Sequence, residues 1–122
     1  MRHIESRMQT VCVQWFPLML PYLANLLFAV PNGGRRTAIE AKIMKGEGVT
    51  AGVSDLLLLV PNKDYHGLAI EMKTSTGRQS PNQKKWQACV EKQGYKYIVC
   101  RSCEAFREEV CAYLSKPANI KR

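Results

Sequence analysis

Residues 53–60 are almost all leucine and valine, and this run constrains the fold more than any other part of the sequence. A short, nearly continuous apolar run is typical of a strand that is buried on both faces of a sheet. Residues 61–64, Pro-Asn-Lys-Asp, predict a turn, and residues 68–73 predict a second strand that becomes polar at its end. We therefore expect the two strands to pair as a hairpin.

Helical patterns lie on both sides of this hairpin in the sequence. Apolar residues recur at helical spacing over residues 4–16, and Pro17 is expected to end or kink that helix. Ser80 as N-cap and Pro81 at the first helical position predict another helix, which Gly94 closes. The other expected elements are a short helical stretch after Pro21, a buried strand over 26–30, a strand over 95–100, and helices over 37–45 and 103–114.

No charged side chain occurs between Arg7 and Arg35, and this uncharged segment could be mistaken for a membrane span. Two observations argue against that interpretation. Pro17 and Pro21 lie inside the segment, and Glu5 stands where a signal peptide would need a cationic region. We instead expect a core helix followed by a buried strand, with part of the apolar surface serving as a dimer face.

Composition limits the class of protein. The 122 residues are enough for one compact domain and too few for two. The excess of 18 Lys and Arg over 10 Asp and Glu, a net charge of +8, favours a polyanionic partner, although it could also serve solubility alone. The five cysteines cannot all pair within the chain and are not spaced like a disulfide framework, so we expect reduced thiols inside a cell.

Two acidic residues interrupt the predicted hairpin where apolar residues would be expected. Asp55 stands at the start of the leucine run, and Glu71 lies within the second strand. Because side chains alternate along a strand, Glu71 and Lys73 share one face. We expect a register that pairs Val60 with Leu68. That register places Asp55 opposite Lys73, on the face that also carries Glu71.

Buried charges are costly unless they are paired or bind a metal ion. A structural ion pair between Glu71 and Lys73 is one interpretation. The other is phosphodiester chemistry with a divalent cation, because Mg²⁺ is held by one or two carboxylates together with water and substrate phosphate. Such an ion lowers the pKa of a bound water, and a nearby lysine can position that water or offset charge on the phosphate.

The segments 52–55 and 70–73 resemble the D…E-x-K core of the PD-(D/E)xK nucleases, with Ser54 where the broader superfamily has proline. More narrowly, the chain resembles the virus-type replication-repair nuclease (VRR-NUC) family. This resemblance extends over nearly the whole chain. The further segments that carry it are Glu5 with Gln9, the turn at 30–34, residues 46–49 ahead of Gly52, residues 80–83, and Gly94 with Tyr95.

The resemblance implies an α/β fold, a restriction-endonuclease-like mixed central sheet flanked by helices in a single domain. The nuclease domain would span residues 1–115, followed by a basic tail over 116–122 that we expect to be loose. The implied metal ligands are Asp55, Glu71, Glu5 and the backbone carbonyl of Met72, with Lys73 as the catalytic lysine and Gln83 beside the site.

Stand-alone members of the family are similar to archaeal Holliday junction resolvases and form dimers. The resemblance therefore implies a Mg²⁺-dependent DNA endonuclease of DNA repair that resolves four-way junctions as a homodimer, with Mn²⁺ able to replace Mg²⁺. It also implies the cytoplasm of a bacterial or phage-infected cell. The side chains from which we expect DNA contacts are Asn32, Arg35, Arg36, Arg78, Lys84 and Lys85.

Two alternatives stay open at this point. One is a nuclease that acts on flaps or other simple branched DNA. The other is a non-catalytic basic DNA-binding module, in which Glu71 and Lys73 are no more than an ion pair.

Overall fold

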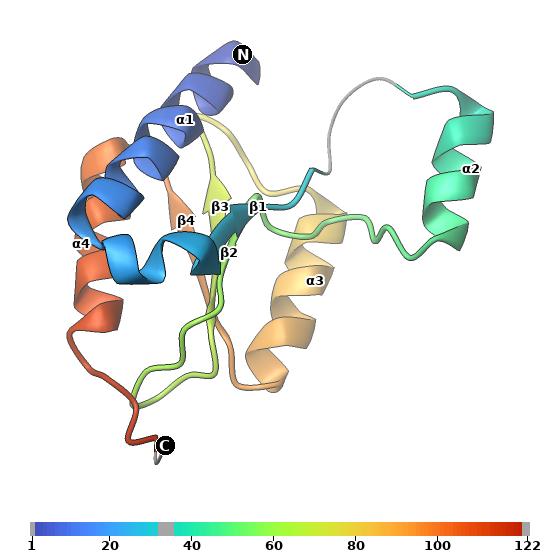
Figure 1. Ribbon diagram of the computed structural model, residues 1–122. Coiled ribbons are helices and arrows are strands. Elements are labelled where there is room, and N and C mark those ends of the chain that lie inside the picture. Colours follow the sequence, from blue (N-terminus) through green and yellow to red (C-terminus); the bar gives the residue numbers. More distant parts are fainter. Residues whose placement is uncertain (1, 32–35, 121–122) are drawn as a thin grey trace.

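The computed structural model describes residues 2–31 and 36–120, which form a four-stranded sheet between helices (Figure 1). The elements in chain order are α1 (Arg2–Met19), the 3₁₀ helix η1 (Pro21–Leu26), β1 (Leu27–Ala29), α2 (Ala38–Gly46), β2 (Leu56–Leu58), β3 (Leu68–Met72), α3 (Pro81–Lys92), β4 (Lys96–Cys100) and α4 (Cys103–Leu114).

The sheet is mixed, and its strand order is β1-β2-β3-β4. The pairs β1–β2 and β2–β3 are antiparallel, whereas β3 and β4 are parallel and are joined through α3. A parallel pair needs such a crossover connection, and a helix usually provides it. The mixed sheet flanked by helices and the β2–β3 hairpin that the sequence predicts are both confirmed.

The register of that hairpin differs from the expected one by two residues. Leu58, not Val60, pairs with Leu68. A shift of two residues keeps every side chain on its original face, since the side-chain period of a strand is two. The shift therefore changes which residues stand opposite one another and leaves the two faces of the sheet unchanged.

The loop between β2 and β3 is longer than the turn that the sequence predicts and has hydrogen bonds of its own. The Asn62 side-chain oxygen accepts hydrogen bonds from the N–H groups of Asp64 and Tyr65, at 2.9 and 2.7 Å. The backbone N–H of Leu59 donates to the carbonyl of Leu26 at 2.9 Å. The Leu59 bond continues the pairing of β2 with β1, while the ladder with β3 begins at Leu58, so the loop between β2 and β3 spans residues 59–67.

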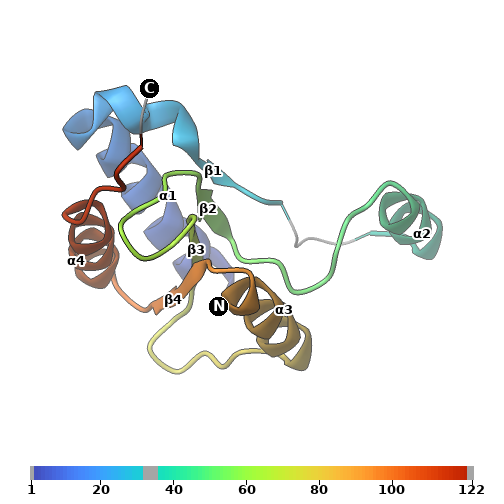
Figure 2. The ribbon, with the colours of Figure 1, turned by 90° about the horizontal axis from the view of Figure 1, so that it is seen from below.

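The two faces of the sheet differ in chemistry. One face is apolar and packs against Phe16 of α1 and Phe106 of α4, and the other carries Glu71 and Tyr97 beneath α3 (Figures 1 and 2). Trp86 of α3 packs edge-on against the Tyr97 ring, with ring centroids 6.0 Å apart. The apolar face is made by Leu56, Leu58, Leu68, Ile70, Met72, Ile98 and Cys100.

Two expected strands are shorter than the sequence suggested. β1 begins at Leu27 because Leu26 ends η1, and β2 covers only the middle of the leucine run. The expected burial of the whole leucine run is also wrong, since Leu59, just after β2, is 53% exposed. Leu57 is half-buried and lines a small cavity together with Trp86. The face that α3 covers is thus only partly closed at this end.

Pro17 lies inside α1 and does not end it, because the helix continues to Met19. Cys12 and Phe16, both buried, anchor this side of the helix in the core. The helix ends soon afterwards, where the N–H of Leu20 donates to the carbonyl of Phe16 at 2.8 Å. Proline is tolerated here because little helix follows it and core packing holds the preceding turn.

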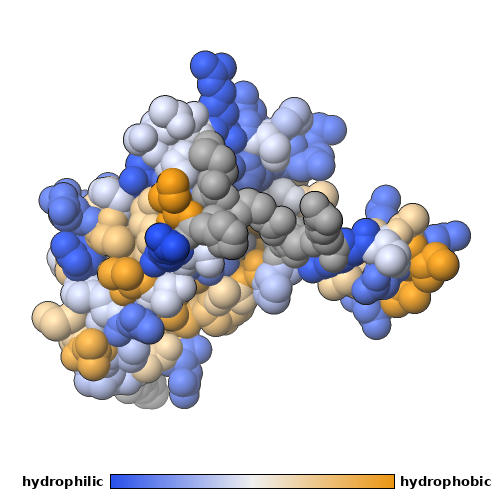
Figure 3. Space-filling model, turned by 90° about the horizontal axis from the view of Figure 1, so that it is seen from above, coloured by the Kyte–Doolittle hydropathy of each residue, from blue (hydrophilic) through white to orange (hydrophobic). Residues whose placement is uncertain are grey.

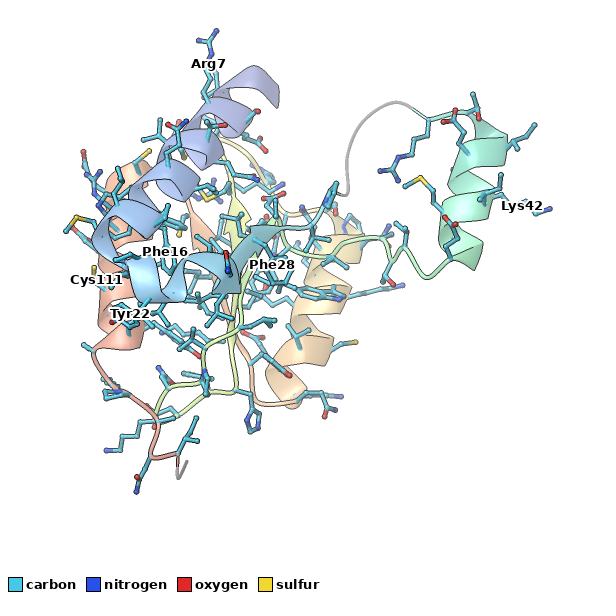
Figure 4. All side chains as sticks on the ribbon, in the orientation of Figure 1. Arg7, Phe16, Tyr22, Phe28, Lys42 and Cys111 are labelled. Atoms are coloured by element: carbon cyan, nitrogen blue, oxygen red, sulfur yellow. The ribbon has the colours of Figure 1, made fainter. Side chains whose placement is uncertain are left out.

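The helix in the uncharged segment does not have the properties of a membrane-spanning helix. Across residues 2–31 and 36–120, no helix is both long and apolar enough to cross a membrane. The segment instead forms α1, η1 and β1 and contributes Cys12, Phe16 and Leu27 to the core. Several of its large apolar side chains remain on the surface, among them Tyr22 and Phe28 (Figure 4).

Helix α2 stands away from the rest of the molecule (Figures 1 and 2). It contains no buried residue, and its Ile39 and Ile43 side chains are exposed. Lys42 points outward from it (Figure 4). A capping box between Thr37 and Glu40 forms its first turn, so local hydrogen bonds hold this helix without support from the core.

The first residues of the basic tail are tied to the body. The N–H of Lys63 donates to the carbonyl of Lys116 at 2.7 Å, and Asn62 pairs with Pro117 as an isolated bridge. The expectation of a loose tail is therefore wrong for these residues. The loop between β2 and β3 thus also holds the tail.

Gly52 fixes how the segment before Asp55 meets α3. Its φ of +86° lies in the left-handed region, which favours glycine. A Cβ at this position would lie 2.3 Å from the carbonyl oxygen of Asn82, which is in the first turn of α3. Only glycine lets the two backbones approach this closely.

Replacing Gly52 with alanine is expected to lower the free energy of unfolding by about 2–3 kcal/mol, because the added Cβ meets Asn82 and strains the backbone. Urea unfolding followed by tryptophan fluorescence measures the change. Gly46→Ala is the matched control, since a Cβ there has no neighbour within 4 Å. Its stability should change by less than about 1 kcal/mol. Equal losses in the two variants would contradict the close approach of Gly52 to α3.

Candidate active site

Asp55 and Glu71 lie at the same end of the sheet, where β2 begins and β3 ends. Continuing the β2–β3 register by one pair places Asp55 opposite Glu71, and not opposite Lys73 as the sequence-based register had it. The Asp55 Oδ2 atom accepts a hydrogen bond from the N–H of Met72 at 2.7 Å. This bond replaces a further rung of the ladder and fixes the Asp55 carboxylate against β3.

Glu71 is a fully buried carboxylate, with 0% of its surface exposed. Its Oε1 atom accepts hydrogen bonds from the Tyr97 hydroxyl and from Nε2 of Gln79, the latter at 3.2 Å. Its Oε2 atom has no hydrogen-bond partner among the described residues and lies 3.5 Å from Nζ of Lys73. The predicted ion pair is present, but the ammonium does not form a hydrogen bond to the buried Oε2 atom.

The charges of this group act on one another. Burial raises the pKa of the Asp55 carboxyl above its ordinary value, while the hydrogen bond from Met72 opposes that rise. The negative charges of Glu71 and Glu5 raise this pKa further, and the Lys73 ammonium lowers it. A second cation at this site would relieve the repulsion that the single ammonium leaves uncompensated.

Tyr97 keeps its proton and acts as a donor. Burial, the hydrogen bond to Glu71 and the charge of that carboxylate all raise the pKa of the phenol above its ordinary value. A protonated phenol beside a carboxylate forms a charge-assisted hydrogen bond, which is stronger than one between neutral groups.

The donor set of the site fits a hard divalent cation held mainly by water. In the described part of the chain, no three Asp, Glu, His or Cys side chains converge so as to hold a metal ion by themselves. The site has two facing carboxylates, and one buried oxygen of Glu71 accepts no hydrogen bond from the described residues. Mg²⁺ needs no more than one or two carboxylates from the protein. Glu5 is half-buried on α1 and influences Asp55 through its charge.

Gln83 lies beside this group and also caps a helix. It lines an open cavity of about 320 Å³ together with Asp55, Gly52, Ser80 and Asn82. Its side-chain oxygen accepts the N–H of Ser80 at 2.8 Å, and the Ser80 hydroxyl oxygen accepts the N–H of Gln83 at 3.2 Å. The side chain thus closes the first turn of α3 at the edge of the cavity.

The side chains predicted to contact DNA fall into three groups. Arg78, Lys84 and Lys85 are exposed and lie in the loop before α3 and in its first turns, next in sequence to residues that line the site. Arg36 is half-buried and lines a cavity of about 500 Å³ between α2 and residues 48–51. Asn32 and Arg35 lie outside the described residues.

Two residues of the site were missed from the sequence. Gln79 was one polar residue in a polar loop, and Tyr97 was one aromatic residue in a strand, where aromatic residues are common. Their relation to Glu71 depends on the parallel β3–β4 register, which pairs Tyr97 with Ala69 on the face of Glu71. The strand order would have revealed Tyr97, whereas no local signal identifies Gln79.

Comparisons with known proteins support the sequence resemblance. The family model of the VRR-NUC domain matches residues 4–104. A solved structure described as a VRR-NUC domain protein is 26% identical, covers 93% of this chain and 90% of its own, and superposes with a TM-score of 0.82. A search of curated proteins finds no match. The shared fold and the match over most of the sequence show that the chain has a nuclease-type fold and belongs to the VRR-NUC family.

Proposed function

We propose that the chain is a metal-dependent DNA endonuclease that hydrolyses phosphodiester bonds in branched DNA, with four-way junctions as its substrate and a homodimer as its working form. The observation that carries this proposal is Glu71, a carboxylate with 0% exposure and one oxygen that accepts no hydrogen bond from the described residues, placed opposite Asp55 and beside Lys73. Family membership supports a nuclease that acts on DNA.

In this proposal Asp55 and Glu71 would hold Mg²⁺ or Mn²⁺, with the Met72 carbonyl and water as further ligands. Glu5, which the sequence resemblance also names as a ligand, does not form a cluster with them in this structure and would act on the site through its charge. When bound, the cation polarises the phosphate and lowers the pKa of a water molecule. Asp55 cannot swing away from β3, because the N–H of Met72 holds its Oδ2 atom at 2.7 Å. The two carboxylates therefore keep a fixed separation for the cation.

Lys73 has the position of a group that serves the reacting phosphate. Its Nζ atom lies 3.5 Å from Glu71, and its side chain is 13% exposed, so it borders both the buried acids and the surface. From there the ammonium can orient the attacking water or donate a hydrogen bond to a phosphate oxygen as negative charge grows. Gln83 stands at the edge of the adjoining cavity, where it can contact the same phosphate.

A homodimer would bring two sites to the two strands that a junction resolvase cuts. Exposed apolar side chains lie in two separate places that a partner could cover: Leu18 and Tyr22, on α1 and η1, are 81% and 79% exposed, and Ile39, on α2, is 73% exposed. Figure 3 shows apolar side chains on the surface at the α2 end of the molecule. A second copy would remove such side chains from water.

One observation favours the non-catalytic alternative. Lys73 lies close enough to Glu71 to act as its structural counter-ion, and no third acidic side chain in the described ranges completes a metal cluster. A basic DNA-binding module with a buried ion pair would have the same two features. Cleavage assays separate the two functions.

Glu71→Gln is expected to lower the rate of DNA cutting at least about 100-fold, because it removes a charged cation ligand while its oxygen can still accept from Tyr97. Cutting of labelled branched DNA is measured with Mg²⁺, with Mn²⁺ and with a chelator, which should abolish it. Glu108→Gln, on the exposed side of α4, is the control and should cut normally. Binding without cutting under every metal would instead support the DNA-binding module.

The wild-type protein is expected to nick a four-way junction at symmetric positions in opposite strands and to sediment as a dimer. Mapping of the cleavage products on sequencing gels and analytical ultracentrifugation measure the two properties. Preferential cutting of flaps, or cutting by a strict monomer, would contradict junction resolution and favour the simpler branched substrate.

DNA affinity is expected to fall steeply with salt, because cations that contact phosphates release counterions. The double variant K84A/K85A should reduce the slope of log K against log[salt] by about 2, one unit for each lost contact. Fluorescence anisotropy in the presence of a chelator measures the slope. K63A/K116A also removes two cations, but near the loop at the opposite end of β2, and should leave the slope unchanged.

A further inference from the structure

The two oxygens of Glu71 are in different environments. Oε1 accepts from Tyr97 and from Gln79, whereas Oε2 accepts no hydrogen bond from any described residue and has only the Lys73 ammonium nearby, with Nζ at 3.5 Å. We infer that Tyr97 and Gln79 are positioning residues, which occupy Oε1 so that Oε2 is the oxygen presented to the cation. This inference rests on the proposed function, because it assigns a role within the same site.

Each of the two donors is held by a separate part of the structure. Tyr97 is on β4, and its ring is fixed by the edge-on contact with Trp86. Gln79 is in the loop between β3 and α3, and Arg101 holds that loop by donating from Nη1 to the carbonyls of Thr74 and Gly77, both at 2.7 Å. The carboxylate is thus held by hydrogen bonds from two separate elements, and its rotation would break at least one of these bonds.

A chain of hydrogen bonds also determines which end of the Gln79 amide faces Glu71. Nε2 of Gln79 donates to Glu71 and, at 2.7 Å, to Oε1 of Gln87 on α3. Nε2 of Gln87 donates in turn to Oε2 of Glu91 at 3.2 Å. Carboxylates only accept hydrogen bonds, so the two acids at the ends of this chain orient both amides between them.

The direction of this chain matters for Glu71. If the Gln79 amide were reversed, its oxygen would face the Glu71 carboxylate, and both bonds from Nε2 would be lost. Glu91 on the surface of α3 prevents this reversal through Gln87, because it requires the amino group of Gln87 to point outward. An exposed acid two side chains away therefore helps to keep a donor on Oε1.

Partners that orient a metal ligand without touching the metal typically change affinity by about 10–100-fold when they are removed. The relevant quantity is the affinity of the DNA-free protein for Mn²⁺, which is measured by titration with electron paramagnetic resonance detection. Tyr97→Phe and Gln79→Met remove one donor each while keeping the shape of the side chain. Each should weaken Mn²⁺ binding by about 10-fold and raise the metal concentration for half-maximal cutting by the same factor.

Tyr113→Phe is the matched control for Tyr97→Phe. Tyr113 is also buried, and its hydroxyl donates to the carbonyl of Val60 at 2.6 Å, far from the two acids along β2. Both variants should lower the melting temperature to a similar extent, but only Tyr97→Phe should weaken Mn²⁺ binding. If both variants lost Mn²⁺ affinity in proportion to their loss of stability, Tyr97 would have only a structural role, and the inference would be overturned.

Gln87→Met tests the hydrogen-bond chain itself, since Gln87 touches neither Glu71 nor the cation. It should weaken Mn²⁺ binding measurably, whereas Gln93→Met at the C-terminal end of α3 should not. Wild-type protein that binds Mn²⁺ and cuts DNA, with Tyr97→Phe and Gln79→Met variants that bind equally well, would overturn the inference alone. Wild-type protein that neither binds Mn²⁺ nor cuts would overturn the proposed function and the inference with it.

Discussion

The burial of the Glu71 carboxylate is the constraint on which the rest of the structure depends. A buried carboxylate without partners would be strongly destabilising, and the folded chain must supply donors from several elements. Tyr97 comes from β4, Gln79 from the loop before α3, and Lys73 from the position directly after β3. The parallel β3–α3–β4 unit brings these groups to one carboxylate. The chemistry of the site therefore depends on the topology of the sheet.

The different chemistry of the two sheet faces follows from the same constraint. The face toward α1 and α4 holds an apolar core and gives the domain its stability through burial. The face toward α3 gives up part of that apolar contact to hold Glu71, Tyr97 and their partners. Trp86 compensates in part, since its ring packs on Tyr97 and shields the polar group from one side. Stability and function are thus divided between opposite faces of four short strands.

Features that depend on local sequence signals were predictable from the sequence, whereas features that depend on contacts between distant segments were not. The N-cap at Ser80 and the left-handed Gly94, with φ +87°, gave the bounds of α3 almost to the residue. The β2–β3 register was predicted wrongly because the turn at 61–64 does not show where the ladder begins, which is at Leu58 and not at Val60. The acids stood out within apolar strands, whereas Tyr97 and the loop glutamine look ordinary until the strand order is known.

The placement of α2 has a consequence for folding. β1 and β2 are adjacent antiparallel strands, so residues 30–55, including α2, are topologically one long hairpin connection. The entropy of closing a loop grows only slowly with its length, but contacts across long loops form later than local ones. The β2–β3 hairpin is the most local pairing of the sheet, and it is also the one that joins Asp55 to β3. We therefore expect the two acids to meet early in folding, and the partners of Glu71 on β4 to arrive only when the crossover through α3 has closed.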